Sequence, residues 1–273
     1  MFMLVVMFRS KIAIIAFFLA ISSLVCRGQF LDSASGLLQA PSAEMSPTGT
    51  VMMTANLLNR HSTPTAWGYN TLGYGVSIVF LSRVEIGYVA ALLYNEHHTV
   101  MDEDGELKVY VLKNQDRHFY AKFQLLKEGE FGISWIPALA VGTSDPTSAE
   151  RAEIVDYSKF DVGGTGNGYF NRYYVVATKH FPTPVGTLGV HLGYQYNLRS
   201  DLHYNGPCAA IDWKPVWLQR ENIVALKLIA EYDARTFNLG FITSLWKDHI
   251  DVMVDLQALK WLSAGVRLKT ILK

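Results

Sequence analysis

The sequence predicts an all-β protein: a single antiparallel transmembrane β-barrel of about twelve strands with a polar lumen, preceded by a cleavable signal peptide. Three observations lead to this prediction. Apolar and polar residues alternate with a period of two along most of the chain. The alternating segments are around ten residues long, which is the length a tilted strand needs to cross a bilayer. The N-terminus carries the charged and then apolar pattern of an export signal.

The composition fits one large all-β domain. The chain has 273 residues, no formal net charge and only 18% charged residues. A nucleic-acid-binding protein would carry a clustered basic surface, so no nucleic-acid partner is predicted.

Residues 1–28 are predicted to be a signal peptide. Arg9 and Lys11 supply positive charge, and the apolar run 12–25 follows. The small residues Cys26 and Gly28, at positions −3 and −1 of the cleavage site, favour cleavage after Gly28. An uncleaved anchor helix and lipid attachment at Cys26 remain the alternatives.

The rest of the chain divides into two parts. Residues 29–49 precede the first strand, contain the turn-forming Pro41 and Gly49, and are expected to form a periplasmic or lumenal segment. Residues 50–273 are expected to form the outer-membrane β-barrel. Cleavage after Gly28 would leave Cys208 as the only cysteine, which excludes an intrachain disulfide.

Alternation is clearest near the C-terminus. Ile250, Val252 and Val254 share one face of a predicted strand, and Asp251 and Asp255 share the other. The candidate strands lie near 50–59, 68–81, 84–88, 118–125, 131–143, 169–180, 187–194, 208–217, 222–232, 237–246, 249–258 and 262–269.

Alternation alone fits both a soluble barrel and a membrane barrel, because only the direction of the apolar face differs. Strand length favours the membrane, as do aromatic residues near strand ends. Connection lengths also favour it: Leu81–Ser82 and Lys127–Gly129 are short, whereas Asn95–Asp116 and Ser144–Gly168 are long. The expected partner of the outer wall is therefore outer-membrane lipid.

This direction assigns the charged residues to the lumen, because charge on the lipid face is costly. The lumen-facing candidates are Lys227, Glu231, Asp251, Asp255, Arg267, Lys269, His191 and His249. The lipid-facing candidates are Val224, Leu226, Val252, Val254, Val266 and Leu268. Two roles stay open for the polar set: a conduit or binding surface, or structural ion pairs that fill a barrel of intermediate bore.

No motif in the sequence predicts a catalytic residue, a cofactor or a metal site. The glycine-rich run 163–168 lacks the following Lys-Ser/Thr of a phosphate-binding loop. His97 and His98 are adjacent, and adjacent side chains of an extended segment point in opposite directions. We therefore expect a loop there, not a metal site, and no enzymatic activity.

Several segments together resemble a known family. They are GLLQAPSAEM at 36–45, AKFQLL at 121–126, PALAVG at 137–142, YYVVATK at 173–179, IDWKP at 211–215, and LIAEYD at 228–233 followed by NLG at 238–240. In this order they resemble the YjbH family of outer-membrane β-barrel proteins associated with exopolysaccharide and capsule production.

The resemblance implies a role in export, assembly or surface retention of an extracellular polysaccharide. It also implies the polysaccharide and other polysaccharide-secretion proteins as partners, and it implies no catalytic residues. The alternatives are a general porin or small-solute channel and, as a third interpretation, an outer-membrane hydrolase.

Overall fold

The computed structural model describes residues 34–61, 70–101, 107–146, 170–197, 205–218 and 223–272, without the side chains of 93–101, 107–116 and 223–225. The signal peptide, Cys26 and the glycine-rich run 163–168 lie outside these residues. The described strands are β1 Thr50–Leu58, β2 Thr71–Phe80, β3 Val84–Met101, β4 Leu107–Leu126, β5 Ala138–Ser144, β6 Arg172–Thr183, β7 Gly186–Tyr196, β8 Gly206–Pro215, β9 Ile223–Tyr232, β10 Phe237–Leu245, β11 Ile250–Gln257 and β12 Trp261–Ile271. Two single turns of 3-10 helix, Glu130–Gly132 and Val216–Leu218, lie between strands.

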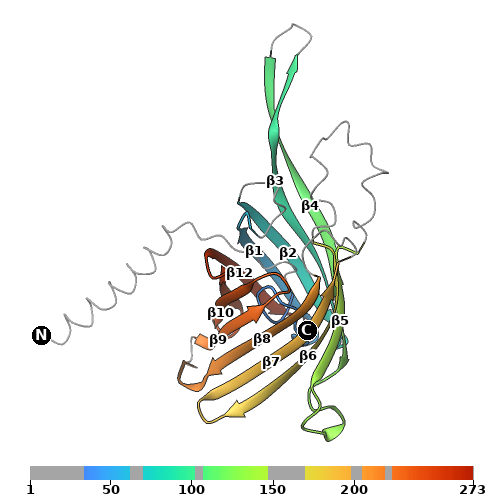
Figure 1. Cartoon of the computed structure of the whole chain (residues 1–273), viewed down its shortest axis with the longest axis vertical. Coiled ribbons are helices and arrows are strands. Elements are labelled where there is room, and N and C mark those ends of the chain that lie inside the picture. The colour runs from blue at the N-terminus through green and yellow to red at the C-terminus, as the bar shows by residue number, and fades with distance from the viewer. Residues whose placement is uncertain are drawn as a thin grey trace, which may run out of the picture.

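The strands form one closed antiparallel barrel in which each strand pairs with its neighbours in the sequence (Figure 1). The barrel closes because β1 pairs with β2 on one side and with β12 on the other, from Thr50 opposite Ile271 to Leu57 opposite Ala264. Closure leaves neither β1 nor β12 as an unpaired edge strand. The prediction of an all-β barrel of about twelve strands is confirmed.

Two predicted connections are wrong. The segment Asn95–Asp116 was expected to be a loop, but β3 and β4 continue as a paired ribbon to Met101 and Leu107 (Figure 1). The segment is polar, so its composition gave no sign of strand pairing. The pairing is formed by backbone hydrogen bonds, which do not require an apolar side chain. The predicted tight turn Lys127–Gly129 is part of a longer connection, because β5 begins only at Ala138.

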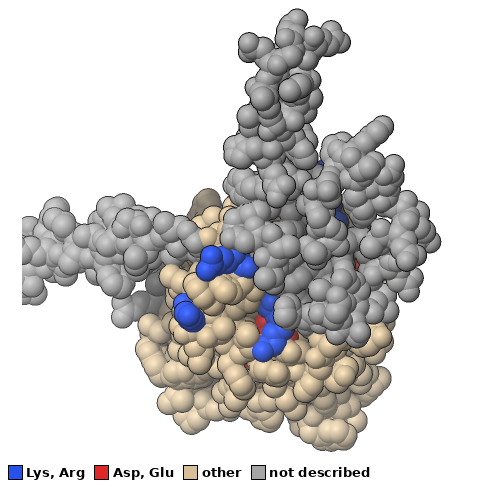
Figure 2. Space-filling view, turned by 45° about the horizontal axis from the view of Figure 1, so that its top comes forward, with Lys and Arg blue, Asp and Glu red and all other residues tan. Residues whose placement is uncertain are grey.

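The inner and outer walls differ as alternation requires. In β11, Asp251, Met253 and Asp255 are buried, and the residues between them are partly exposed. In β12, Val266 and Leu268 are 42% and 50% exposed on the other face. Tan, uncharged side chains cover most of the described wall in Figure 2, and the Lys and Arg side chains gather at a few places. No helix in the described part of the chain is long and apolar enough to span a membrane.

Two tyrosines cover glycines of the neighbouring strand on the inner wall. Gly142 lies opposite Tyr174, and a Cβ built on Gly142 would lie 2.3 Å from the Tyr174 ring. Gly87 likewise lies opposite Tyr120, and a Cβ built on Gly87 would lie 2.1 Å from the Tyr120 ring. Only glycine leaves room for a ring to lie flat on the neighbouring backbone, so these pairs shape the interior.

We expect Gly142→Val to destabilise the barrel by about 1–3 kcal/mol, because the added side chain displaces the Tyr174 ring from a packed interior. Urea unfolding in lipid vesicles, followed by tryptophan fluorescence, measures this. The control is Val141→Ala on the outer wall, where Val141 is 36% exposed. Equal stability of Gly142→Val and wild type would show that the ring does not need this position.

Candidate functional site: the plugged lumen

Residues 34–46 fold into the barrel as a loop, which we call the plug. It enters at the end where β1 begins and β12 ends, runs toward the opposite end and returns. The two limbs meet where the Ser35 and Ser46 hydroxyls hydrogen-bond at 3.0 Å. Residues 35–43 are all buried, and Ala43 is 0% exposed. The lumen is therefore packed at the level of the plug.

A buried ion pair holds the base of the plug. Lys122 Nζ lies 3.1 Å from Glu85 Oε2, and the two side chains are 1% and 0% exposed. Glu85 accepts hydrogen bonds from the Ser35 N–H and hydroxyl. Lys122 donates to the backbone carbonyls of Ser35 and Glu44. This pair thus fixes both limbs of the plug to β3 and β4.

The tip of the plug lies among carboxylates near the far end of the lumen. The Gln39 N–H donates to Glu231 Oε1 at 2.7 Å, and the Gln39 side-chain amide donates to Asp255 Oδ2 at 2.8 Å. Arg172 donates to the Gln39 carbonyl. Backbone groups and one side-chain amide of the plug therefore bond to charged residue types on β6, β9 and β11.

Glu44 is the charged centre of the returning limb. Its carboxylate lies 2.6 Å from Lys227 Nζ, 3.3 Å from Lys214 Nζ and 3.2 Å from His180 Nε2. Burial acts to raise the pKa of Glu44, but Lys227, His180 and Lys214 together hold this pKa well below its ordinary value. Glu44 is therefore ionised when it bridges β6, β8 and β9.

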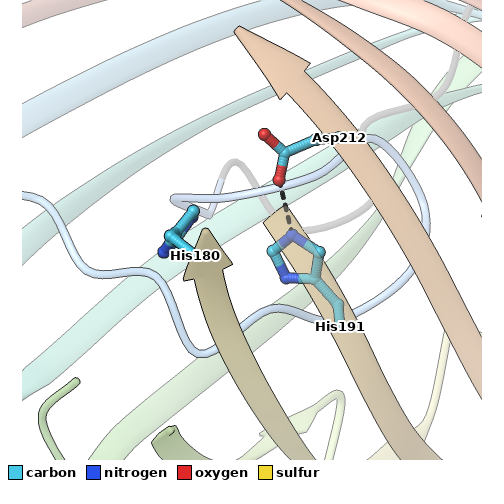
Figure 3. Close-up of side chains that lie close together, drawn as sticks. All are labelled: His180, His191 and Asp212. Carbon is cyan, nitrogen blue, oxygen red and sulfur yellow. Dashed lines mark hydrogen bonds and ion pairs between the residues drawn. The ribbon is translucent and has the colours of Figure 1, made fainter. Parts of the chain in front are cut away.

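A histidine links the plug to the wall beside Glu44. His191 Nε2 lies 2.7 Å from Asp212 Oδ2, and His191 Nδ1 lies 2.9 Å from Thr178 Oγ1 and 3.2 Å from Ser42 Oγ. Asp212 and His191 point toward one another in Figure 3, and His180 lies on the neighbouring strand. Asp212, His191 and Ser42 are the residue types of a hydrolytic triad. Ser42 is 3% exposed and His191 1%, so both lie buried between the plug and the wall.

Seven of the eight lumen-facing candidates lie on the inner wall. Glu231, Asp251, Asp255, Arg267 and His191 are buried, and Lys227 and Lys269 are mostly buried and ion-paired. Arg267 and Lys269 both bond to Asp251, and Arg267 also donates to the Ala34 carbonyl. The assignment of His249 to the lumen is wrong: it lies exposed in the turn before β11, and its ring contacts the Lys269 carbonyl and Trp246.

Of the lipid-facing candidates, Leu226, Val252, Val254, Val266 and Leu268 lie on the face opposite the buried residues. The side chain of Val224 is outside the described residues. His97 and His98 lie within β3, not in a loop, and their side chains are also not described.

Sequence reasoning missed the partners of the lumenal charges. Glu85, Lys122 and Arg172 lie in segments whose alternation was recognised, so their inward direction could have been predicted. Their pairing with the plug could not, because the partners are mainly backbone groups far away in the chain.

A polar cavity of about 300 Å³ remains beside the plug, toward the end of the barrel where the chain enters. Lys214, Lys227, Arg267 and Lys269 line it together with Glu44 and Asp251. Each of these cations is engaged by a carboxylate on the same lining. The lining therefore carries four cations against three carboxylates, those of Glu44, Asp248 and Asp251.

The fold and the lumen define a closed, plugged β-barrel with many apolar side chains on the described outer wall and an ion-paired interior. The chain matches the model of the YjbH family, described as exopolysaccharide biosynthesis protein YbjH, over residues 32–207. The match covers more than half of the chain, and the protein belongs to this family. A comparison with curated proteins finds no match.

The matched range contains the plug and the strands up to β7, together with the first residues of β8. It includes four of the segments that carried the resemblance in the sequence. The segments at 211–215, 228–233 and 238–240 lie beyond it.

We expect Lys122→Met to destabilise the barrel by about 3–5 kcal/mol, because it leaves Glu85 buried without its cation. The double variant Lys122→Met with Glu85→Gln should recover much of this loss, because the uncompensated charge is gone. Urea unfolding in lipid vesicles measures both variants. A double variant no more stable than the single one would contradict the role of the ion pair.

A second prediction concerns Asp233 in the turn between β9 and β10. Burial acts to raise its pKa, but Arg235 and the backbone N–H groups of Thr236 and Arg235 hold it below the ordinary value of 3.8. A carboxyl whose pKa is lower in the folded state stabilises above its unfolded pKa, and this contribution is lost as pH falls through the folded pKa.

We therefore expect Asp233→Asn to cost about 1.5–3 kcal/mol at pH 7, the range for hydrogen bonds to charged groups. The difference from wild type should shrink as the pH falls below about 4. Urea midpoints of both proteins at a series of pH values measure it. A difference that does not depend on pH would contradict the ionic contribution.

Proposed function

We propose that the protein acts in the outer membrane, where it assists export, assembly or surface retention of an extracellular polysaccharide. One observation carries the proposal: the chain belongs to an exopolysaccharide biosynthesis family and folds as a closed, plugged barrel. Its partners are outer-membrane lipid, the polysaccharide and other polysaccharide-secretion proteins.

The outer wall supports the membrane location. Large apolar side chains stand exposed around it, among them Phe119 at 66%, Leu192 at 61% and Ile211 at 53%. A soluble barrel would turn such residues inward, whereas lipid accepts them. The short turns Leu81–Arg83 and Pro184–Val185 lie at the end that holds the start of β1 and the end of β12. In an outer-membrane barrel this end faces the periplasm.

The plug favours this function over a general porin. Porins of large bore keep a water-filled lumen, whereas the plug buries its own residues and its partners on the inner wall. Solute passage would require the plug to move.

We also propose that the protein is not an enzyme. Among the described residues, Asp212, His191 and Ser42 form a hydrogen-bonded series with the residue types of a hydrolase, and this series is buried between the plug and the wall. Its hydrogen bonds are those of a structural link.

Deletion of the gene tests the function. We expect the deletion strain to lose surface polysaccharide and to regain it with the wild-type gene. The protein should fractionate with the outer membrane as a band of heat-modifiable gel mobility. Unchanged amount and attachment of polysaccharide would overturn the role, and recovery from the soluble periplasm would overturn the location.

The plug makes a separate prediction in planar bilayers. We expect no steady current from the wild-type protein and an ion current from a variant that lacks residues 34–46. Ala43→Trp should also conduct, because Ala43 is fully buried and a larger side chain forces the plug from the wall. Thr48→Trp, at an exposed position, is the matched control. A steady current through the wild-type protein would instead favour the porin.

A further inference from the structure

Three neighbouring strands bring two histidines and an aspartate together on the inner wall. His180 on β6, Gly189 on β7 and Asp212 on β8 are cross-strand neighbours in one row. Thr178, His191 and Ala210 form the adjacent row. The ligand atoms of His180, His191 and Asp212 lie within 4.8 Å of one another. Figure 3 shows the three side chains and the strands that carry them.

Gly189, between His180 and Asp212 in the first row, leaves space for the Asp212 side chain. A Cβ on Gly189 would lie 2.0 Å from Asp212 Oδ2, so only glycine lets the Asp212 carboxylate lie over β7 and reach His191. Ala210, opposite His191, is also small. The space between the three side chains is therefore set by backbone positions and not by a chance rotamer.

The Nδ1 atom of each histidine contacts a hydrogen-bond partner, as the non-ligating ring nitrogen does in metal sites. A ligating histidine commonly donates its other ring N–H to a carboxylate or another acceptor, which fixes the ring. His180 Nδ1 lies 2.6 Å from Glu128 Oε2, and His191 Nδ1 lies 2.9 Å from Thr178 Oγ1. The two Nε2 atoms face carboxylates, His191 Nε2 that of Asp212 and His180 Nε2 that of Glu44.

One further observation points to a ligand. Asp212 is 0% exposed, and its Oδ1 has no hydrogen-bond partner among the described residues. A buried carboxylate oxygen without a donor is costly. A cation beside it would remove this cost.

We propose that His180, His191 and Asp212 bind a divalent transition-metal ion of the zinc class inside the barrel. Two imidazoles and one carboxylate are a ligand set that Zn²⁺ accepts, with a fourth position for water. Tetrahedral bonds of about 2.1 Å place ligand atoms roughly 3.4 Å apart. Small side-chain rotations bring the three groups to this spacing. The ion replaces the hydrogen bond between His191 and Asp212, and the proton of that bond is released to the solvent.

Charge and access fit the proposal. Lys227 and Lys214 form ion pairs with Glu44, whereas the partner of the Asp212 carboxylate is His191, itself one of the three ligands. Glu44 contacts His180 and also lines the cavity of about 300 Å³, which gives the ion a path from the end where the chain enters. The bound ion would join β6, β7 and β8 directly beneath the plug.

The test is Zn²⁺ titration of the purified full chain, stripped with a chelator, by isothermal titration calorimetry. Co²⁺ absorption reports the coordination geometry in parallel. We expect one Zn²⁺ per chain for wild type and for the control His249→Gln, which changes an exposed histidine. His180→Gln should weaken binding by more than about 100-fold, and Glu128→Gln by about 10–100-fold.

His180 and Glu128 have side chains that are 22% and 26% exposed, so these variants keep the barrel even if Asp212→Asn does not fold. Heat-modifiable gel mobility verifies the fold of each variant. No Zn²⁺ binding by wild type would overturn the proposal. Unchanged affinity in His180→Gln would also overturn it, because the ion would then be held elsewhere.

Discussion

The structure depends on one constraint: polar groups that a barrel turns inward must find their partners inside. In the membrane location that we propose, lipid on the outer face makes outward charge costly, and alternation sends the charged residues into the lumen. A barrel of this size has too little space to hydrate them all freely. The plug meets the constraint, because its backbone carries donors and acceptors to the charges on the inner wall.

The ion pairs follow from the same constraint. Lys122 and Glu85 neutralise each other at the base of the plug, and Arg267 and Lys269 share Asp251 on the far side. Glu44 is the plug's own contribution to this balance, and it meets cations from two strands. Breaking one pair leaves a buried charge, whereas removing both partners does not. The charges of the inner wall and those of the plug therefore depend on each other for stability.

The sequence predicts the direction of side chains much better than it predicts their partners. Alternation placed Asp251 and Asp255 inside and Val252 and Val254 outside, because a period of two is a local property of an extended strand. His249 failed at a strand end, where the chain turns and the alternation no longer fixes the direction. The position of Gln39 between Glu231 and Asp255 depends on residues about 200 positions away, and no local pattern carries it.

The plug bonds to the wall mainly through its backbone, and this bears on a role with polysaccharide. The N–H groups of Ser35, Gln39 and Ala43 donate to wall side chains, and nearby carbonyls accept from Lys122 and Arg172. A sugar hydroxyl both donates and accepts hydrogen bonds, as a backbone amide pair does. The wall that satisfies a polypeptide loop thus has the donors and acceptors that a glycan chain needs. Glu44 is the exception, because a neutral sugar cannot replace a carboxylate between Lys214 and Lys227. If a glycan takes the place of the plug, its acidic groups are the ones that fit there.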